Sequence, residues 1–121
     1  MIFLDQKAAF PSIARNYMFW VLEKMMIPSH IIAAIKLLYE NNTAVVKFGN
    51  SKEVTFEMQQ GIRQGCPLSG TLWALVFDPV VRLLSCRIDY RHTKLSAYAD
   101  DMAFVLHSIK NGLPLLADAL T

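Results

Sequence analysis

The sequence predicts an α+β fold in which helices cover one antiparallel sheet. Short runs alternate apolar and polar residues on either side of turn residues, as the strands of antiparallel hairpins do. Other segments carry apolar residues at helical spacing and stop before a proline or a pair of asparagines. Along the chain the order is strand, two helices, hairpin, loop and helix, hairpin, helix. That order is typical of an antiparallel sheet with helices packed against it.

The composition indicates one domain with an unusually apolar surface or core. The chain has 121 residues, of which 54% are hydrophobic and 18% are charged. An ordinary small soluble domain is less apolar, so this domain is either the core of something larger or covered by a partner. The net charge of +2 is too small to indicate nucleic-acid binding by itself. Any basic binding surface would have to be local.

Neither the cysteines nor the apolar runs predict an oxidising compartment, a signal peptide or a membrane span. Cys66 and Cys86 form no C-x-x-C pair and the histidines are scattered, so the sequence shows no zinc pattern and no disulfide framework. The first apolar run is too short for a signal peptide. The longest apolar region, residues 72–84, is interrupted by Asp78, Pro79 and Arg82, and we expect no membrane span.

Most of the first half of the chain is predicted to have a structural role. Residues 1–4 predict a buried strand, and Asp5 at its end would in isolation be an ordinary turn or cap residue. Pro11 stops the strand, and Ser12 is the expected N-cap of a helix that ends before Pro28. The expected buried positions of this helix are Ile13, Tyr17, Trp20, Val21 and Met25. Ser29 should cap a second helix that buries Ile31, Ile32, Ile35, Leu38 and Tyr39 and ends at Asn41-Asn42.

A hairpin and an unusual loop follow. Residues 44–48 and 54–58 alternate around a predicted two-residue turn at Gly49-Asn50, with one apolar and one polar face. Residues 61–70 contain three glycines and a proline, which favour neither helix nor strand, so this segment is either an ordinary connection or a loop that a ligand approaches closely. A helix should start at Ser69, kink or restart at Pro79, and lead into an exposed basic turn over residues 87–94.

The last hairpin carries two adjacent carboxylates at its predicted tip, Asp100 and Asp101. Two such charges a few ångströms apart repel by roughly 4 kcal/mol at an effective dielectric constant near 20. Either the tip lies in water, where screening removes most of that cost, or the pair holds divalent metal ions. If the strand that ends at Asp5 lies beside this hairpin, three carboxylates meet at one sheet edge, which suits magnesium and phosphoryl transfer. Asn111-Gly112 should break the chain before a final helix over residues 113–120.

Three segments together resemble the core palm motifs of reverse transcriptases, most closely those of non-LTR (LINE-type) retrotransposons. They are Phe-Leu-Asp-Gln-Lys-Ala-Ala-Phe at residues 3–10, Gly-Ile-Arg-Gln-Gly-Cys-Pro-Leu-Ser at residues 61–69, and Ala-Tyr-Ala-Asp-Asp at residues 97–101. They occur in the order that the family has. The resemblance implies that residues 1–121 are a partial palm domain, with the family's fingers and thumb absent.

The resemblance also implies an RNA-directed DNA polymerase that adds deoxynucleotides to a primer 3′-hydroxyl by two-metal phosphoryl transfer. Asp5, Asp100 and Asp101 would be catalytic and would hold two Mg²⁺ ions, which Mn²⁺ could replace. The nucleotide would contact Gln6, Phe10, Gln64 and Gly65, with the ring of Phe10 leaving no room for a ribose 2′-hydroxyl. Arg63 and Tyr98 would contact template and primer.

Some residues depart from the family pattern, and other functions stay open. Many relatives carry Asp at the position of Pro11 and Pro at that of Gly70, although neither position binds metal. The implied partners are an RNA template, a DNA primer, deoxynucleoside triphosphates and the missing segments of a longer chain, without a membrane. The alternative is a truncated, inactive retroelement remnant that binds a partner through its apolar surface. An RNA-templated RNA polymerase is a third possibility, against which Phe10 argues. A nuclear location is expected only for a eukaryotic element.

Overall fold

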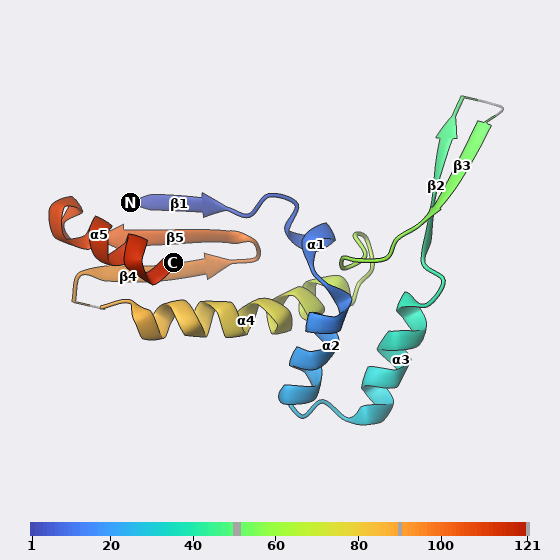
Figure 1. Ribbon diagram of the computed structural model, residues 1–121, viewed down its shortest axis with the longest axis horizontal. Helices are drawn as coiled ribbons and strands as arrows, with labels where there is room; N and C mark the ends of the chain where they lie inside the picture. The colour runs from blue at the N-terminus through green and yellow to red at the C-terminus, as the bar shows by residue number, and fades with distance from the viewer. Residues whose placement is uncertain (50–51, 90, 121) are drawn as a thin grey trace. The chain divides into compact units, whose positions relative to one another are not determined.

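The computed structural model describes residues 1–49, 52–89 and 91–120 and divides the chain into two compact units (Figure 1). The sheet unit consists of Met1–Ala9 and Gly70–Thr121. The loop unit consists of Phe10–Ser69 and contains the glycine-rich segment after residue 60. Each unit has its own packing. The single palm domain over residues 1–121 therefore remains a prediction.

The sheet unit is built on three antiparallel strands in the order β1-β5-β4. They are β1 (Ile2–Asp5), β4 (Thr93–Tyr98) and β5 (Asp101–Leu106), and β5 lies in the middle (Figure 1). β1 was predicted from its apolar run, and the β4–β5 hairpin from two apolar runs with Val, Phe, Tyr and Leu. β1 was expected to be buried, but its Phe3 is 72% exposed because one face of the sheet is uncovered. Their adjacency, on which the meeting of the acids depended, is confirmed by the pairing of β1 with β5.

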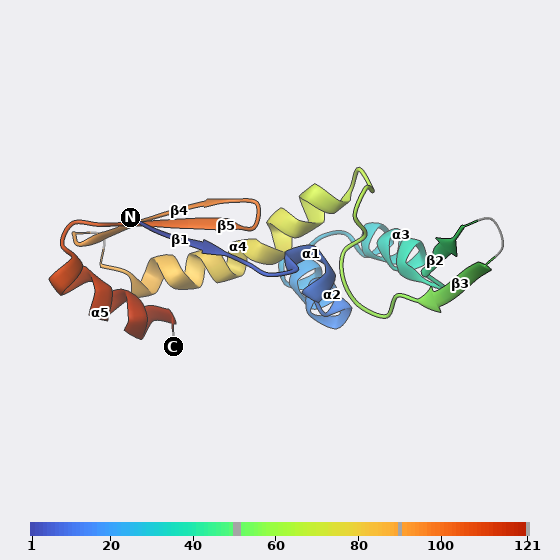
Figure 2. The same cartoon turned by 90° about the horizontal axis from the view of Figure 1, so that it is seen from above.

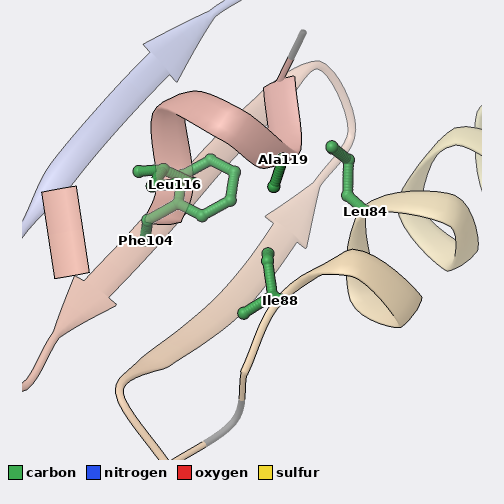
Figure 3. Packing of buried hydrophobic residues seen from close by; sticks show 5 residues of the cluster. All are labelled: Leu84, Ile88, Phe104, Leu116 and Ala119. Carbon is green, nitrogen blue, oxygen red and sulfur yellow. The ribbon is translucent and has the colours of Figure 1, made fainter. Parts of the chain in front are cut away.

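Helices α4 (Ser69–Arg87) and α5 (Ile109–Leu120) cover one face of this sheet, as Figure 2 shows from above. Phe104 of β5 is 0% exposed and lies at the centre of the core. Around it pack Leu84, Ile88, Leu116 and Ala119, which converge in Figure 3. The strands contribute Ile2, Leu4, Leu95, Met102 and Leu106 to the same core. The predicted α+β fold, an antiparallel sheet with helices on one face, is confirmed.

Two local predictions in the sheet unit were wrong, and a third is narrowed. Of the kink or restart expected at Pro79, the restart is excluded, because α4 continues through Pro79 as one helix of 19 residues. Ile88 and Thr93 are buried, so residues 87–94 are not a wholly exposed turn. Gly112 does not break the chain but lies inside α5, where an added Cβ would stand 3.2 Å from the Leu106 side chain. A glycine there lets the helix pass close to the end of β5.

α4 is longer than the apolar region on which the expectation of no membrane span was based. It has 19 residues and a window of mean hydropathy 1.2, so by length and composition alone it could cross a membrane. One such helix is weak evidence, because the core helix of a soluble protein meets the same criteria. Leu84 of α4 belongs to the core on the sheet.

The loop unit contains all but the first residue of the short helix α1 (Ala9–Ser12), then α2 (Arg15–Lys24) and α3 (Ser29–Tyr39). α1 was not predicted, and Ala14 rather than Ser12 precedes α2 as its N-cap. α2 buries Met18, Val21 and Leu22, whereas Trp20 is 53% exposed. α3 buries Ile32, Ile35 and Tyr39, as predicted, but leaves Ile31 and Leu38 exposed.

Strands β2 (Thr43–Phe48) and β3 (Lys52–Glu57) form the predicted hairpin as a separate two-stranded sheet. The predicted turn at Gly49-Asn50 includes residue 50, which lies outside the described residues. The apolar face of the β2–β3 hairpin is not covered within the described structure, and Phe56 on it is 50% exposed. On the other face Lys47 and Glu53 pair at 2.8 Å between Nζ and Oε1.

Candidate active site

The pairing of β1 with β5 sets Asp5 directly opposite Asp101. Directly opposed residues of antiparallel strands project to the same face, with Cα atoms about 4.5–5.5 Å apart. Asp100 is the residue before β5, in the turn between β4 and β5. We call these three residues the carboxylate edge. The strand register therefore brings Asp5 and Asp101 together, with Asp100 next in the chain, while the close meeting of all three acids stays a prediction.

The turn that presents these acids has an unusual backbone. Tyr98 pairs with Asp101, which leaves Ala99 and Asp100 as a two-residue turn. Ala99 has a φ of 52°, in the left-handed region. A positive φ at the first central residue is typical of the I′ and II′ turns of two-residue hairpins, where glycine, asparagine or aspartate is favoured. Backbone strain of this kind costs roughly 1–3 kcal/mol and tends to gather at functional sites.

The carboxylate edge belongs to the sheet face that the helices do not cover. Because side chains alternate along a strand, Asp5 shares its face with Phe3, opposite to the face of Ile2 and Leu4 that packs on the core. Phe3, Asp5 and Asp101 are exposed. Tyr98, predicted to lie near the primer end, is 84% exposed on this same face. A nucleic-acid strand could approach the acids from this side.

The donor chemistry of the edge fits a magnesium ion shared with a substrate. Among the described residues, no three His, Cys, Asp or Glu side chains group closely enough to form a protein cage for a metal. Magnesium usually takes only one or two carboxylates, with water and substrate phosphates completing its shell. Two opposed carboxylates on an open face match that requirement. The assignment of all three acids as metal ligands stays a prediction.

In the loop unit, the segment after residue 60 is held against the residues that follow the first motif. The Ile62 N–H donates to the Phe10 carbonyl at 2.8 Å, and the Gly61 N–H donates to that of Ile13 at 2.8 Å. Gly61 has a φ of 88°, and a Cβ there would stand 2.8 Å from the backbone of Pro11. Phe10 and the loop, both assigned to the nucleotide by resemblance, are therefore neighbours.

Arg63 is anchored at the end of α3. Its guanidinium donates from Nη1 to the Leu38 carbonyl at 3.3 Å, and its backbone N–H donates to the Tyr39 hydroxyl at 3.4 Å. The Ser69 hydroxyl donates to the Arg63 carbonyl and closes the loop. Gln64 and Gly65 remain exposed between these anchors. Sequence reasoning placed Tyr39 on a buried helix face but missed its contact with the loop, because only the fold brings residues 39 and 63 together.

The predicted site residues thus form two groups. The sheet unit holds Asp5, Gln6, Tyr98, Asp100 and Asp101, and the loop unit holds Phe10, Arg63, Gln64 and Gly65. Within each group the structure supports proximity along strand pairs or backbone hydrogen bonds. The individual roles of these residues stay predictions.

The fold and the site define an α+β domain with paired carboxylates on the open face of an antiparallel sheet. The sequence matches the family described as "Reverse transcriptase (RNA-dependent DNA polymerase)" over residues 1–121. The chain therefore belongs to the reverse transcriptase family, as its three motifs predicted.

Two curated proteins of transposable elements are similar to the chain. "Transposon TX1 uncharacterized 149 kDa protein" of Xenopus laevis is 32% identical over 113 residues, which cover 88% of this chain and 9% of that protein. "Retrovirus-related Pol polyprotein from type-2 retrotransposable element R2DM" of Drosophila melanogaster is 27% identical over 119 residues, which cover 95% of this chain and 11% of that protein. The chain thus spans about a tenth of the length of these relatives.

Proposed function

We propose that the chain supplies the catalytic carboxylates of an RNA-directed DNA polymerase, which adds deoxynucleotides to a primer 3′-hydroxyl on an RNA template. The observation that carries this proposal is the register of β1 and β5, which sets Asp5 opposite Asp101 beside Asp100. Family membership supports the reaction class. Phosphoryl transfer of this kind depends mainly on positioning and on charge neutralisation, which an array of fixed carboxylates can organise.

Asp5, Asp100 and Asp101 would hold Mg²⁺, with two ions and Mn²⁺ as a possible substitute. The chemistry supplied there is activation of the attacking hydroxyl and neutralisation of charge on the transferred and leaving phosphates. The part of the protein is to fix the acids on paired strands, so that little reorganisation is needed when substrate binds. The open face beside them leaves space for the primer end near Tyr98.

The loop unit would contact the incoming deoxynucleotide. Phe10 would lie against the sugar and exclude a 2′-hydroxyl, and Gln64 and Gly65 would pack on the nucleotide and template. The proposal is supported by the hydrogen bond from Ile62 to Phe10, which ties the loop to this residue. Gln6, next to Asp5, would complete the nucleotide site, and Arg63 would contact a template phosphate with the guanidinium nitrogens that do not contact Leu38.

Metal binding tests the carboxylate edge directly. Mn²⁺ titrated into the chain should broaden the amide resonances of residues 5, 100 and 101 first. Asp5→Asn and Asp100→Asn should each weaken Mn²⁺ binding by about tenfold or more, the factor that about 1.4 kcal/mol of lost interaction produces. Asp78→Asn is the matched control, because Asp78 lies in α4 and pairs with Arg82. Equal affinity in all four proteins would refute the site.

Primer extension on an RNA template, in Mg²⁺ and then in Mn²⁺, tests the activity. Incorporation that disappears in Asp100→Asn and persists in Asp78→Asn is the expected result for a chain that suffices for catalysis. Incorporation that survives in Asp100→Asn would show that the proposed residues do not carry the reaction.

A second candidate function is a catalytically inactive fragment that binds a partner. The observation in its favour is the apolar face of the β2–β3 hairpin, where Phe48, Val54 and Phe56 are exposed. This function requires no metal at the carboxylate edge. The Mn²⁺ titration therefore distinguishes it from the polymerase.

A further inference from the structure

A second polar feature lies on the β4–β5 hairpin, at the end opposite the carboxylate edge. A hollow of about 330 Å³ opens there, between the start of β4 and the end of β5. Four of the residues that line it are basic, namely Arg91, His92, Lys94 and His107, and the others are Thr93, Val105 and Leu106. We call this hollow the basic pocket. It belongs wholly to the sheet unit, as the carboxylate edge does.

Three basic residues of the pocket lie on the same sheet face as the acids, although its lining also includes Thr93 and Leu106 of the opposite face. Lys94 pairs with Val105, which lies four residues after Asp101 and therefore shares its face. The His107 N–H donates to the His92 carbonyl at 2.8 Å, which continues the strand pairing beyond Thr93 and Leu106. By the same alternation His92 and His107 fall on the face of Lys94. One face of the hairpin thus carries acids at one end and bases at the other.

Asp89 contacts two of these basic residues, Arg91 and His92. Its Oδ1 accepts from the Arg91 backbone N–H at 3.0 Å and from Arg91 Nε at 3.2 Å, and its Oδ2 lies 3.1 Å from His92 Nδ1. These hydrogen bonds, that of the Arg91 backbone first, lower the pKa of Asp89 to about 2. The carboxylate therefore stays ionised and holds both bases in place.

The residues at the basic pocket carry a net positive charge. In the described part of the chain, every ion pair at this end of the hairpin involves Asp89. Arg91 and Lys94 bring two positive charges against that one carboxylate. Asp89 meets Arg91 through Nε, so the two terminal guanidinium nitrogens remain outside that contact. A concave site with guanidinium, ammonium and imidazole donors suits a phosphate.

The separation of the two sites matches a nucleic-acid strand. His107 lies six residues beyond Asp101, which at about 3.4 Å per strand residue amounts to roughly 20 Å. Stacked nucleotides advance about 3.4 Å per step along a duplex, so the same span corresponds to about six base steps.

We propose that the basic pocket of Arg91, His92, Lys94 and His107 binds a backbone phosphate of the nucleic-acid duplex, about six base steps from the carboxylate edge. This inference rests on the proposed function, because it takes the end of the primer to lie at the acids. The pocket positions the duplex and reads no bases, since phosphate contacts carry no sequence information.

The salt dependence of duplex binding tests the pocket. Each phosphate contact contributes about 0.9 to the slope of log K against log salt concentration. Lys94→Gln should reduce the slope by about 0.9 for an RNA–DNA duplex of about twelve base pairs, measured by fluorescence anisotropy. The control is Lys47→Gln, which removes the same charge from β2 and should leave the slope unchanged. Lys94 is exposed on an edge strand, so its replacement should not affect folding.

Duplex length and free phosphate separate the possible sources of the anion. With a duplex of about four base pairs, too short to reach from the acids to the pocket and kept paired by an uncharged linker between its strands, Lys94→Gln should bind as the unsubstituted chain does. An unchanged slope on the long duplex would overturn the pocket alone and leave the polymerase proposal to its metal test. Inorganic phosphate that shifts the imidazole resonances of His92 and His107, together with an unchanged slope, would assign the pocket to a free anion and overturn the inference. Absence of duplex binding at any salt concentration would overturn both proposals.

Discussion

At the scale of single residues, Gly61 shows how a backbone position can be fixed by a contact far away in the sequence. Its φ of 88° already disfavours any side chain, and the backbone of Pro11 stands where a Cβ would be. Gly65 has a similar φ of 82° but open space around it. The two glycines of one loop therefore serve different purposes. The first brings the loop onto the segment after the first motif, and the second only allows the chain to turn.

Replacement of these glycines by alanine should separate the two effects. Gly65→Ala should cost about 1–2 kcal/mol of unfolding free energy, the strain of a side chain in the left-handed region. Gly61→Ala should cost more than this, because the new methyl group also has to displace Pro11. Chemical denaturation measures both values, and the chemical shifts of Phe10 report the displacement.

Gly70→Ala is the control for this series. Gly70 lies in α4 with open space around it, so alanine should leave the stability unchanged or raise it by up to about 1 kcal/mol. Equal losses of unfolding free energy for Gly61→Ala and Gly65→Ala would show that the close approach to Pro11 does not add to the cost of a side chain at residue 61.

At the scale of elements, the pairing of β1 with β5 sets two like charges directly opposite each other, Asp5 and Asp101. Like charges in this position destabilise a sheet, whereas most cross-strand pairs stabilise it. The central strand of the sheet thus carries an electrostatic cost at the place where metal binding is proposed. A bound cation would remove that cost.

Neutralising one of these acids should stabilise the chain in the absence of metal. Asp101→Asn should raise the unfolding free energy by about 0.2–1 kcal/mol in chelator, because the cross-strand repulsion is lost. Mg²⁺ should stabilise the unsubstituted chain more than the variant, since a ligand that binds only the folded state stabilises it by mass action. Thermal unfolding with and without Mg²⁺ measures both effects.

The control for this prediction is Asp78→Asn, which breaks an exposed ion pair with Arg82 within α4. It should lower stability by about 0.3–0.5 kcal/mol and leave the effect of Mg²⁺ unchanged. If Asp101→Asn were less stable than the unsubstituted chain in chelator, the two carboxylates would not repel each other in the folded state.

The sequence predicted the elements whose conformation is set by neighbouring residues. It did not predict those whose conformation is set by contacts between residues far apart in the chain. Alternation sufficed for the strands of the β2–β3 hairpin, and apolar runs on either side of two acids sufficed for those of the β4–β5 hairpin. Local rules failed where packing overrides them. Gly112 was expected to end a segment, but it lies in α5 beside Leu106. The contacts of the loop with Pro11 and Tyr39 depend on the tertiary fold, so spacing along the chain could not reveal them.

At the scale of the whole molecule, the two units differ in how well their sheets are supported. In the sheet unit β5 is paired on both sides, and its Phe104 is completely buried beneath two helices. In the loop unit the β2–β3 hairpin has only two strands and exposes its apolar side chains. An isolated two-stranded hairpin is at best marginally stable in water, whereas strands in a core open only when the unit unfolds.

Hydrogen exchange should reveal this difference directly. We expect the amides of β5 to exchange most slowly and those of β2 and β3 to be among the fastest of the strand amides. Phe104→Ala removes the largest side chain of the core on the sheet and should cost about 3–5 kcal/mol. Exchange should then accelerate throughout β1, β4, β5 and α5. The amides of β2 and β3 should keep their exchange rates, because the opening of that hairpin does not involve this core. Val105→Ala, on the exposed face of the same strand, is the matched control and should change little. If Phe104→Ala accelerated the hairpin amides as much as those of β5, the two units would unfold as one cooperative structure.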